Sequence, residues 1–194
     1  MSKGRLEAFS DGVIAILITI MVLELRAPHE ADIAALGPLV PVFLSYLLSF
    51  VFVGIYWNNH HHMLHAAREV NGRILWANLH LLFWLSLVPF TTNWMGENPR
   101  VAVPVAIYGL VLLMAGVAYF ILSRALITHH GADSPLARAI GTDRKGKLSM
   151  ALYAVAIPSS FLATWMALGL YVVVALMWFV PDRRFERPRG ADAA

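Results

Sequence analysis

Long apolar stretches separated by short polar segments dominate the chain. Residues 12–23 contain no charged side chain and a single hydroxyl, and residues 148–180 run for 33 residues without Lys, Arg, Asp or Glu. A helix needs about 20 residues to cross the hydrocarbon core of a bilayer. Apolar stretches of this length and number predict an all-α integral membrane protein.

Four spans follow directly from the pattern, and the last apolar block must be one helix or two. The four spans cover residues 6–25, 36–59, 75–95 and 101–126. Pro38 and Pro41 suit a first helical turn, and Pro89 predicts a kink within the third span. A single helix over 148–180 would be about 50 Å long, too long for the core even with strong tilt. A break near 161–165 gives two short spans instead, and six transmembrane helices in all.

The basic residues support six spans and give them an orientation. With the N-terminus inside, thirteen of the fifteen Lys and Arg residues fall on the inner side, and only Arg26 and Arg100 fall in outer loops. Five spans would place the four C-terminal arginines outside and change the ratio to nine against six. The positive-inside rule therefore predicts a cell inner-membrane protein with both termini in the cytoplasm. We expect one transmembrane domain over 1–181 and a basic cytoplasmic tail over 182–194.

The amino-acid composition is also that of a membrane protein. The chain is 59% hydrophobic and 14% charged, with a mean hydropathy of +0.64, whereas soluble domains carry about 25% charged residues. The absence of cysteine excludes disulfides, thiolate metal sites and cysteine nucleophiles. The net charge of +3 follows from orientation in the membrane, so no nucleic-acid partner is expected.

Ionisable groups inside the predicted spans are few. Asp11 lies near the inner end of the first span and Glu24 near its outer end, and no carboxylate, Lys or Arg falls in the middle of any other span. Proton-coupled transporters and intramembrane hydrolases usually carry such groups at depth. The sequence therefore predicts no catalytic residues and no enzyme.

A histidine cluster, His60 to His65, closes the second span. His61 and His65 are four residues apart, so a helix places them on one face, as a zinc site requires. No third ligand is evident, and no Glu stands between them as in H-E-x-x-H. We interpret the cluster as a hydrogen-bonding helix end at the cytoplasmic interface and predict no metal site. Whether it senses pH or metal stays open.

The start of the first span carries a distinctive R-x-x-x-F-S-D string, formed by Arg5, Phe9, Ser10 and Asp11. Tyr56-Trp57-x-x-His60 ends the second span, and Asn78-Leu79 precedes Pro89-Phe90 in the third. Together these motifs resemble the transmembrane protein 175 family of potassium channels, in its bacterial form with one six-helix repeat per subunit. The resemblance implies a structural signature made of Arg5, Phe9, Ser10, Asp11, Trp57, His60 and Asn78.

The resemblance also implies an assembly and a pore. It implies a homotetramer whose first helices surround a central pore, with potassium as the permeant ion and no cofactor. No T-V-G-Y-G string is present, so a carbonyl filter of the usual potassium-channel kind is not expected. In the family, the constriction lies five residues after the aspartate of the motif, and a threonine follows three residues after the constriction. These positions are Ile16 and Thr19.

A helical wheel shows which residues can share the pore side with Ile16. Gly12, Ile16, Thr19, Ile20 and Leu23 form one stripe about 100° wide. The resemblance thus implies Ile16, Thr19, Ile20 and Leu23 as pore-lining residues, with Ile16 as the constriction gate.

Two signature residues fall differently on the wheel. Asp11 lies about 140° from Ile16 and is expected to be structural, paired with Trp57, His60 or Asn78. Arg5 falls on the pore side, so it must turn toward a neighbour at the inner mouth, or the helix must start irregularly.

The leading hypothesis is a potassium-favouring cation channel with a hydrophobic constriction, a homotetramer that acts on monovalent cations. The alternative is a small secondary transporter or exporter. A third possibility is an interaction subunit without a pore of its own. The lack of mid-membrane carboxylates counts against proton coupling.

Overall fold

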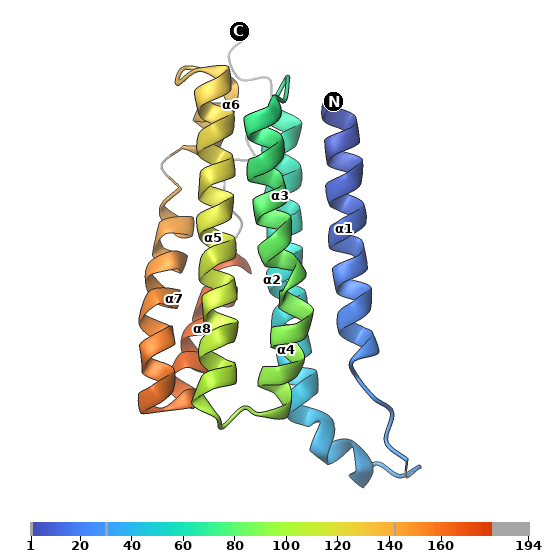
Figure 1. The fold of residues 1–194 in the computed structure, drawn as a ribbon. Helices are drawn as coiled ribbons and strands as arrows, with labels where there is room; N and C mark the ends of the chain where they lie inside the picture. Colours follow the sequence, from blue (N-terminus) through green and yellow to red (C-terminus); the bar gives the residue numbers. More distant parts are fainter. Residues whose placement is uncertain (1, 30, 142, 180–194) are drawn as a thin grey trace, which may run out of the picture.

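The computed structural model describes residues 2–29, 31–141 and 143–179, and the predicted tail over 182–194 lies outside this part of the chain. Every regular element in the described part is helical (Figure 1). The elements are α1 (Lys3–Leu23), η1 (Ala34–Leu39), α2 (Val40–Ala66), α3 (Gly72–Ser86), α4 (Val88–Glu97), α5 (Ala102–His130), α6 (Pro135–Ile140), α7 (Arg144–Leu162) and α8 (Thr164–Phe179). The predicted all-α class is confirmed.

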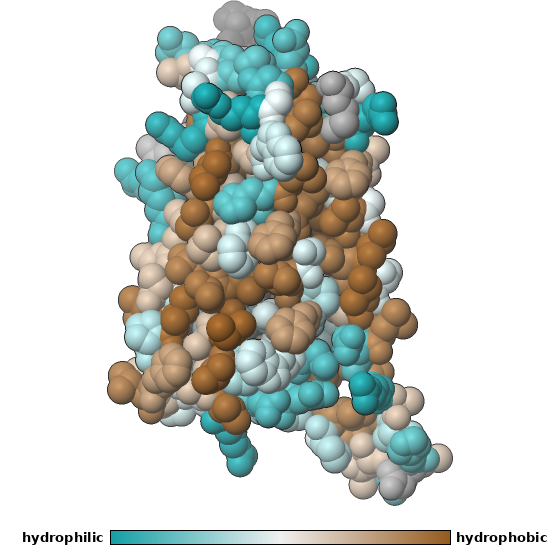
Figure 2. All heavy atoms as spheres, viewed as in Figure 1, coloured by the Kyte–Doolittle hydropathy of each residue, from teal (hydrophilic) through white to brown (hydrophobic). Residues whose placement is uncertain are grey.

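Within the described part of the chain, four helical segments are long and apolar enough to cross a bilayer. They are Lys3–Leu23, Ala34–Ala66, Gly72–Glu97 and Ala102–His130. Figure 2 shows apolar residues over the middle of the molecule and polar residues gathered toward its two ends. The protein is therefore a multi-pass membrane protein.

The helix breaks fall where the sequence predicts them. The third span divides at Leu87 into α3 and α4, with Pro89 in the first turn of α4, because proline lacks the N–H that a continuous helix needs. The last apolar block divides at Ala163, whose extended backbone (φ −160°, ψ 118°) separates α7 from α8. The second span extends further than predicted, since α2 continues through the histidine cluster to Ala66.

Two hydrophobic clusters hold the helices together. One includes Leu6, Val53, Leu81 and Leu122, which come from α1, α2, α3 and α5. The other joins α2 and α5 to α7 and α8 and is rich in aromatic rings. Helices α2, α4 and α5 contribute to both clusters and connect the two parts of the subunit.

Close packing between α5 and α8 depends on a glycine. The hydroxyl of Tyr171 donates to the Val105 carbonyl at 3.0 Å, and a Cβ on Gly109 would collide with that hydroxyl. Small residues let membrane helices approach in this way.

Two histidines at the end of α5 bind the connector between α2 and α3. The backbone N–H groups of Arg68 and Glu69 donate to Nε2 of His130 at 3.0 and 3.3 Å. Backbone N–H groups can only donate, so Nε2 must accept and the ring proton must lie on Nδ1, which bonds the Leu126 carbonyl at 2.9 Å. His130 is therefore neutral in this arrangement.

The neighbouring histidine makes a similar contact. Asn71 caps α3 by accepting from the Ile74 N–H through Oδ1. Its amide Nδ2 therefore faces Nδ1 of His129, at 3.1 Å, and the imidazole nitrogen accepts.

Replacing His130 should loosen this connector. His130→Phe removes the acceptor for the two backbone N–H groups of Arg68 and Glu69. We expect amide protection at these two residues to fall about fivefold, measured by hydrogen exchange. His61→Phe, which changes an exposed ring of the histidine cluster, should leave this protection unchanged. Protection that is independent of His130 would contradict this assignment.

Candidate pore-lining helix and its polar anchor

Helix α1 has one buried face and one exposed face within the subunit. Its buried residues recur every three or four positions and contact α2, α3 and α4; they are Leu6, Ser10, Ile14, Leu17 and Met21. Ile16 and Leu23 on the opposite side are 57% and 77% exposed, and Gly12, Thr19 and Ile20 are exposed beside them. The predicted stripe therefore lies on the face of α1 that the subunit leaves uncovered.

A chain of hydrogen bonds crosses from α2 through α3 to α1. Ser10 donates its hydroxyl proton to the Leu6 carbonyl at 2.8 Å, so its oxygen can only accept from Nδ2 of Asn78, 3.0 Å away. Asn78 consequently presents Oδ1 to Nε2 of His60 at 2.7 Å. The proton on the His60 ring must lie on Nε2 for this bond to form.

Burial makes this chain of bonds energetically important. Ser10 and Asn78 are fully buried and His60 is 1% exposed. A buried polar group without a hydrogen-bond partner still bears the full free-energy cost of its removal from water. Lipid offers it no replacement partner. The three side chains therefore fix the rotation of α1 against α2 and α3.

Asp11 makes a separate contact at the edge of this network. Its Oδ1 accepts a hydrogen bond from Nε1 of Trp57 at 3.0 Å. Of the three partners expected for Asp11, Trp57 is the one it contacts, while His60 and Asn78 bond each other. The sequence reasoning missed Ser10 as the α1 member of the buried network, although Ser10 lies in the middle of the buried face.

The inner end of α1 is regular. The helix begins at Lys3, and Arg5 and Phe9 are exposed on its surface. Lys3 donates to the His65 carbonyl at 3.0 Å and lies 3.7 Å from a Glu7 carboxylate oxygen. The irregular helix start considered for Arg5 does not occur.

The exposed stripe carries one polar side chain. The hydroxyl of Thr19 donates to the Ile16 carbonyl at 2.8 Å. Because its proton is used inside the helix, the lone pairs of the oxygen remain to accept. The stripe thus combines branched apolar side chains with an acceptor oxygen one turn from Ile16.

The histidine cluster lies outside this network. The rings of His61 and His65 stack with centroids 6.0 Å apart, and both are exposed. Among the residues that the structure describes, no group of three or more His, Cys, Asp or Glu side chains could hold a metal ion.

Removing the central amide should destabilise the subunit. Asn78→Leu leaves the His60 N–H and the Ser10 oxygen without partners and should lower the free energy of unfolding by about 1–3 kcal/mol. Thermal denaturation in detergent would measure the loss. Asn93→Leu on α4 is a matched control, since Asn93 makes no hydrogen bond within the described residues. Equal stability of the two variants would count against the network.

Comparison with known proteins identifies relatives along the whole chain. The family model described as endosomal/lysosomal potassium channel TMEM175 matches residues 5–89. A potassium channel of Chryseobacterium sp. (strain P1-3) is 52% identical over 96% of this chain and 97% of its own length. A potassium channel of Streptomyces collinus is 32% identical over 96% of this chain and 98% of its own.

A solved structure has the same fold. The crystal structure of a lysosomal potassium-selective channel TMEM175 homolog from Chamaesiphon minutus superposes with a TM-score of 0.79 at 30% identity, covering 92% of this chain and 96% of that chain. The family indicated by the R-x-x-x-F-S-D string is thereby confirmed: the chain belongs to the TMEM175 family of ion channels.

Proposed function

We propose that this protein is a potassium-favouring cation channel of the cell inner membrane, assembled from four copies around a central pore lined by α1. The observation that carries the proposal is the stripe of Ile16, Thr19, Ile20 and Leu23, which the subunit leaves uncovered although the opposite face of α1 is buried against α2, α3 and α4. Two full-length relatives are named as potassium channels, which supports potassium as the favoured ion. The permeant ion is the only small partner this function requires, and no cofactor is expected.

Six transmembrane helices per subunit fit this proposal. Helices α3 and α4 together form the third span, and α7 and α8 form the fifth and sixth. The 19 residues of α7 reach about 28 Å, close to the hydrocarbon thickness. The N-terminal ends of α1 and α7 point toward the same end of the bundle (Figure 1) and carry Lys3, Arg5, Lys145 and Lys147, which supports a cytoplasmic location for that end.

Ile16 is the proposed gate. In a tetramer, four copies of this side chain would meet at the axis, and a narrow apolar ring excludes water. An ion then loses part of its hydration shell without receiving oxygen ligands in return, so conduction stops until the ring widens.

Thr19 would act just outward of the gate. It lies about 4.5 Å further along the helix, and its oxygen retains free lone pairs because the hydroxyl proton bonds the Ile16 carbonyl. Four such oxygens could replace part of the hydration of a monovalent cation. Ile20 and Leu23 would continue the pore wall toward the outside.

The signature residues would hold this pore in place rather than line it. Ser10, Asn78 and His60 set the rotation of α1, and Asp11 with Trp57 secures its inner half. Arg5 and Phe9 complete the signature at the inner end of the helix.

A small secondary transporter or exporter is the alternative. Liposomes that contain only the purified protein distinguish the two, because a channel passes potassium down its gradient without a coupled ion. Potassium flux that requires a second gradient would favour the transporter.

Substitution of Ile16 tests the gate. Ile16→Asn should hold water in the constriction and raise the potassium current several-fold with weaker discrimination among cations, and Ile16→Ala should act similarly by widening it. Planar-bilayer recording of purified protein provides the measurement.

Ile18 is the matched control for this experiment. It points about 200° away from Ile16 and packs against the hydrophobic cluster of α1 to α5. Ile18→Asn and Ile18→Ala should therefore weaken packing without raising current. Open channels from the Ile18 variants and closed ones from the Ile16 variants would refute the proposed register.

Orientation can be tested separately. The chain has no cysteine, so a single introduced cysteine reports its own location. Ser2→Cys should stay unlabelled by a membrane-impermeant maleimide added to intact cells, whereas Arg26→Cys in the first outer loop should be labelled. The reverse result would invert the proposed topology.

A further inference from the structure

An apolar groove lies between α2 and α8, on elements that the proposed pore does not use. Its volume is about 630 Å³, within the range of about 300–1,000 Å³ that is common for the sites of small ligands. Side chains of α2 form one wall and side chains of α8 form the other, and the buried Met95 of α4 lies at its floor. None of the described residues that line it belongs to α1.

The walls of the groove are apolar over almost their whole length. Leu44 and Leu47 are exposed on the α2 wall, and Val172 and Leu176 are exposed on the α8 wall. An empty groove of this kind forfeits dispersion contacts, because its lining atoms have no neighbours on one side. A hydrocarbon chain would restore these contacts, whereas a polar group would lose hydration without finding partners.

The groove is long enough for an acyl chain of one leaflet. Its α8 wall extends from Thr164 to Phe179, which is about 22 Å along the helix axis. Half of the hydrocarbon core of a bilayer is about 15 Å thick. A chain that enters at one end of the groove would therefore lie within it along the full depth of its leaflet.

A positive charge stands at one end of the groove. Arg100, in the link between α4 and α5, is exposed and is the one charged side chain among the described residues that line the groove. Figure 1 places this link and the start of α8 at the same end of the bundle, opposite the N-terminus of α1. A guanidinium can hold a phosphate through two parallel hydrogen bonds.

The start of α8 adds to the attraction for an anion at this end. The helix begins at Thr164, which lines the groove together with Arg100. The first N–H groups of a helix have no partner within it, and the helix dipole is positive there. An apolar trough with an anion site at one end matches the shape and charge of a phospholipid.

We propose that this groove binds an anionic phospholipid, with one acyl chain between α2 and α8 and the phosphate at Arg100 and the start of α8. No Asp or Glu lines the groove within the described part of the chain, so the ammonium of a zwitterionic headgroup finds no counter-ion in its wall. The placement of this lipid in the outer leaflet rests on the proposed orientation of the bundle, whereas the binding itself does not.

Lipid titration of the delipidated full-length protein in detergent tests the proposal. Native mass spectrometry counts the lipids retained by each subunit, with phosphatidylglycerol as the probe and phosphatidylethanolamine of the same acyl chains as the reference. We expect phosphatidylglycerol to bind about fivefold more tightly. Equal retention of the two lipids would overturn the proposal.

The anion site has a matched pair of variants. Arg100→Gln removes the charge at the end of the groove and should weaken phosphatidylglycerol binding about fivefold. Arg26→Gln changes the other arginine of the predicted outer loops, which does not line the groove, and should leave binding unchanged. Binding that is equally tight in both variants would contradict the assigned phosphate site and overturn the proposal.

The acyl-chain site has a matched pair on α8. Val172 and Val173 are 44% and 51% exposed, but Val172 lines the groove and Val173 does not. Val172→Trp should fill the groove and remove most phosphatidylglycerol binding, whereas Val173→Trp should not. Undiminished binding in Val172→Trp would overturn the proposal.

A neighbouring subunit could cover the same groove, and the subunit number separates this case from a lipid. Native mass spectrometry of the same two variants measures that number directly. Loss of the assembly in Val172→Trp but not in Val173→Trp would identify a second copy as the occupant and overturn the proposal. An unchanged subunit number together with lost phosphatidylglycerol supports it.

Discussion

The hydrogen-bonded chain from His60 through Asn78 to Ser10 sets the geometry on which the proposed pore depends. Helix α1 is apolar on almost every side, and lipid tails solvate an isoleucine as well as a neighbouring helix does. Hydrophobic burial alone therefore selects no rotation for α1. The bond between Asn78 and Ser10 does select a rotation, because the buried Nδ2 of Asn78 donates to the Ser10 oxygen and hydrocarbon offers no substitute acceptor. Once Ser10 faces α3, Ile16 lies about 120° away on the helix and is turned outward.

The sequence predicted the parts of the fold that depend on hydropathy and proline. The helical segments follow the apolar blocks, Pro89 marks the break between α3 and α4, and the last block divides where length requires it. These features arise from local composition, so a single sequence contains them. The wheel also separated Asp11 from Ile16, and the motifs of the second and third spans supplied Trp57 as one of three candidate partners for the carboxylate.

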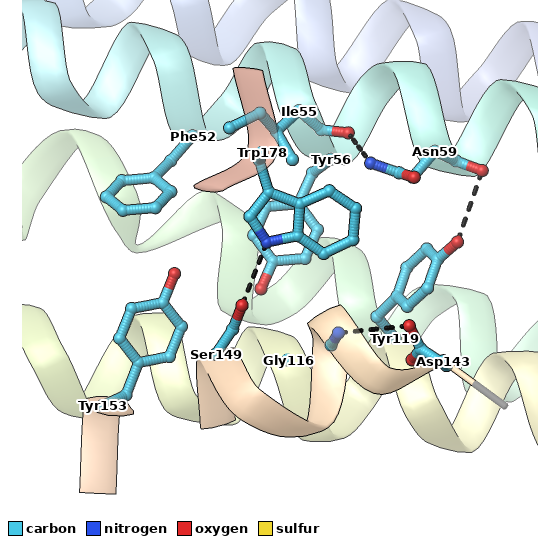
Figure 3. A pocket seen from close by; sticks show the side chains of 11 residues that line it. Phe52, Ile55, Tyr56, Asn59, Gly116, Tyr119, Asp143, Ser149, Tyr153 and Trp178 are labelled. Atoms are coloured by element: carbon cyan, nitrogen blue, oxygen red, sulfur yellow. Dashed lines mark hydrogen bonds between the residues drawn. The ribbon is translucent and has the colours of Figure 1, made fainter. Parts of the chain in front are cut away.

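Features that depend on distant residues could not be predicted in this way. His130 bonds Arg68 and Glu69 across about sixty residues of sequence, and no local pattern indicates the pairing. Ser10 was placed in the signature but not in the buried network, because Asp11 is the more polar of two adjacent residues. A cavity of about 40 Å³, lined by residues of α2, α5, α7 and α8 (Figure 3), was not predicted, since each aromatic residue in its wall is also an ordinary residue for a membrane span.

The two halves of the subunit differ in how tightly their helices are packed. Around α5, α7 and α8, aromatic rings interlock and Tyr171 bonds backbone across helices, which favours a rigid body. Within the described residues, helix α1 packs mainly on α2, α3 and α4 and is held there by a few polar bonds. The proposed gate would need a part that can shift against a part that cannot, and this difference in packing is compatible with that requirement.

The order of residues along the uncovered stripe of α1 affects the energy barrier that the proposed gate would present to a passing ion. The free energy needed to move an ion through a water-free apolar constriction increases with the length of the constriction, because the hydration that the ion loses there is not replaced. On α1 the acceptor oxygen of Thr19 follows Ile16 after about 4.5 Å, and Gly12, which has no side chain to narrow the pore, precedes it by about 6 Å. The fully apolar segment is thus close to one ring thick. Such a ring can stop hydrated ions when narrow, yet a small outward movement or tilt of α1 would suffice to wet it. The polar anchor and the proposed constriction would therefore be compatible, since the anchor would limit how far α1 can move and a short constriction would require only a small movement.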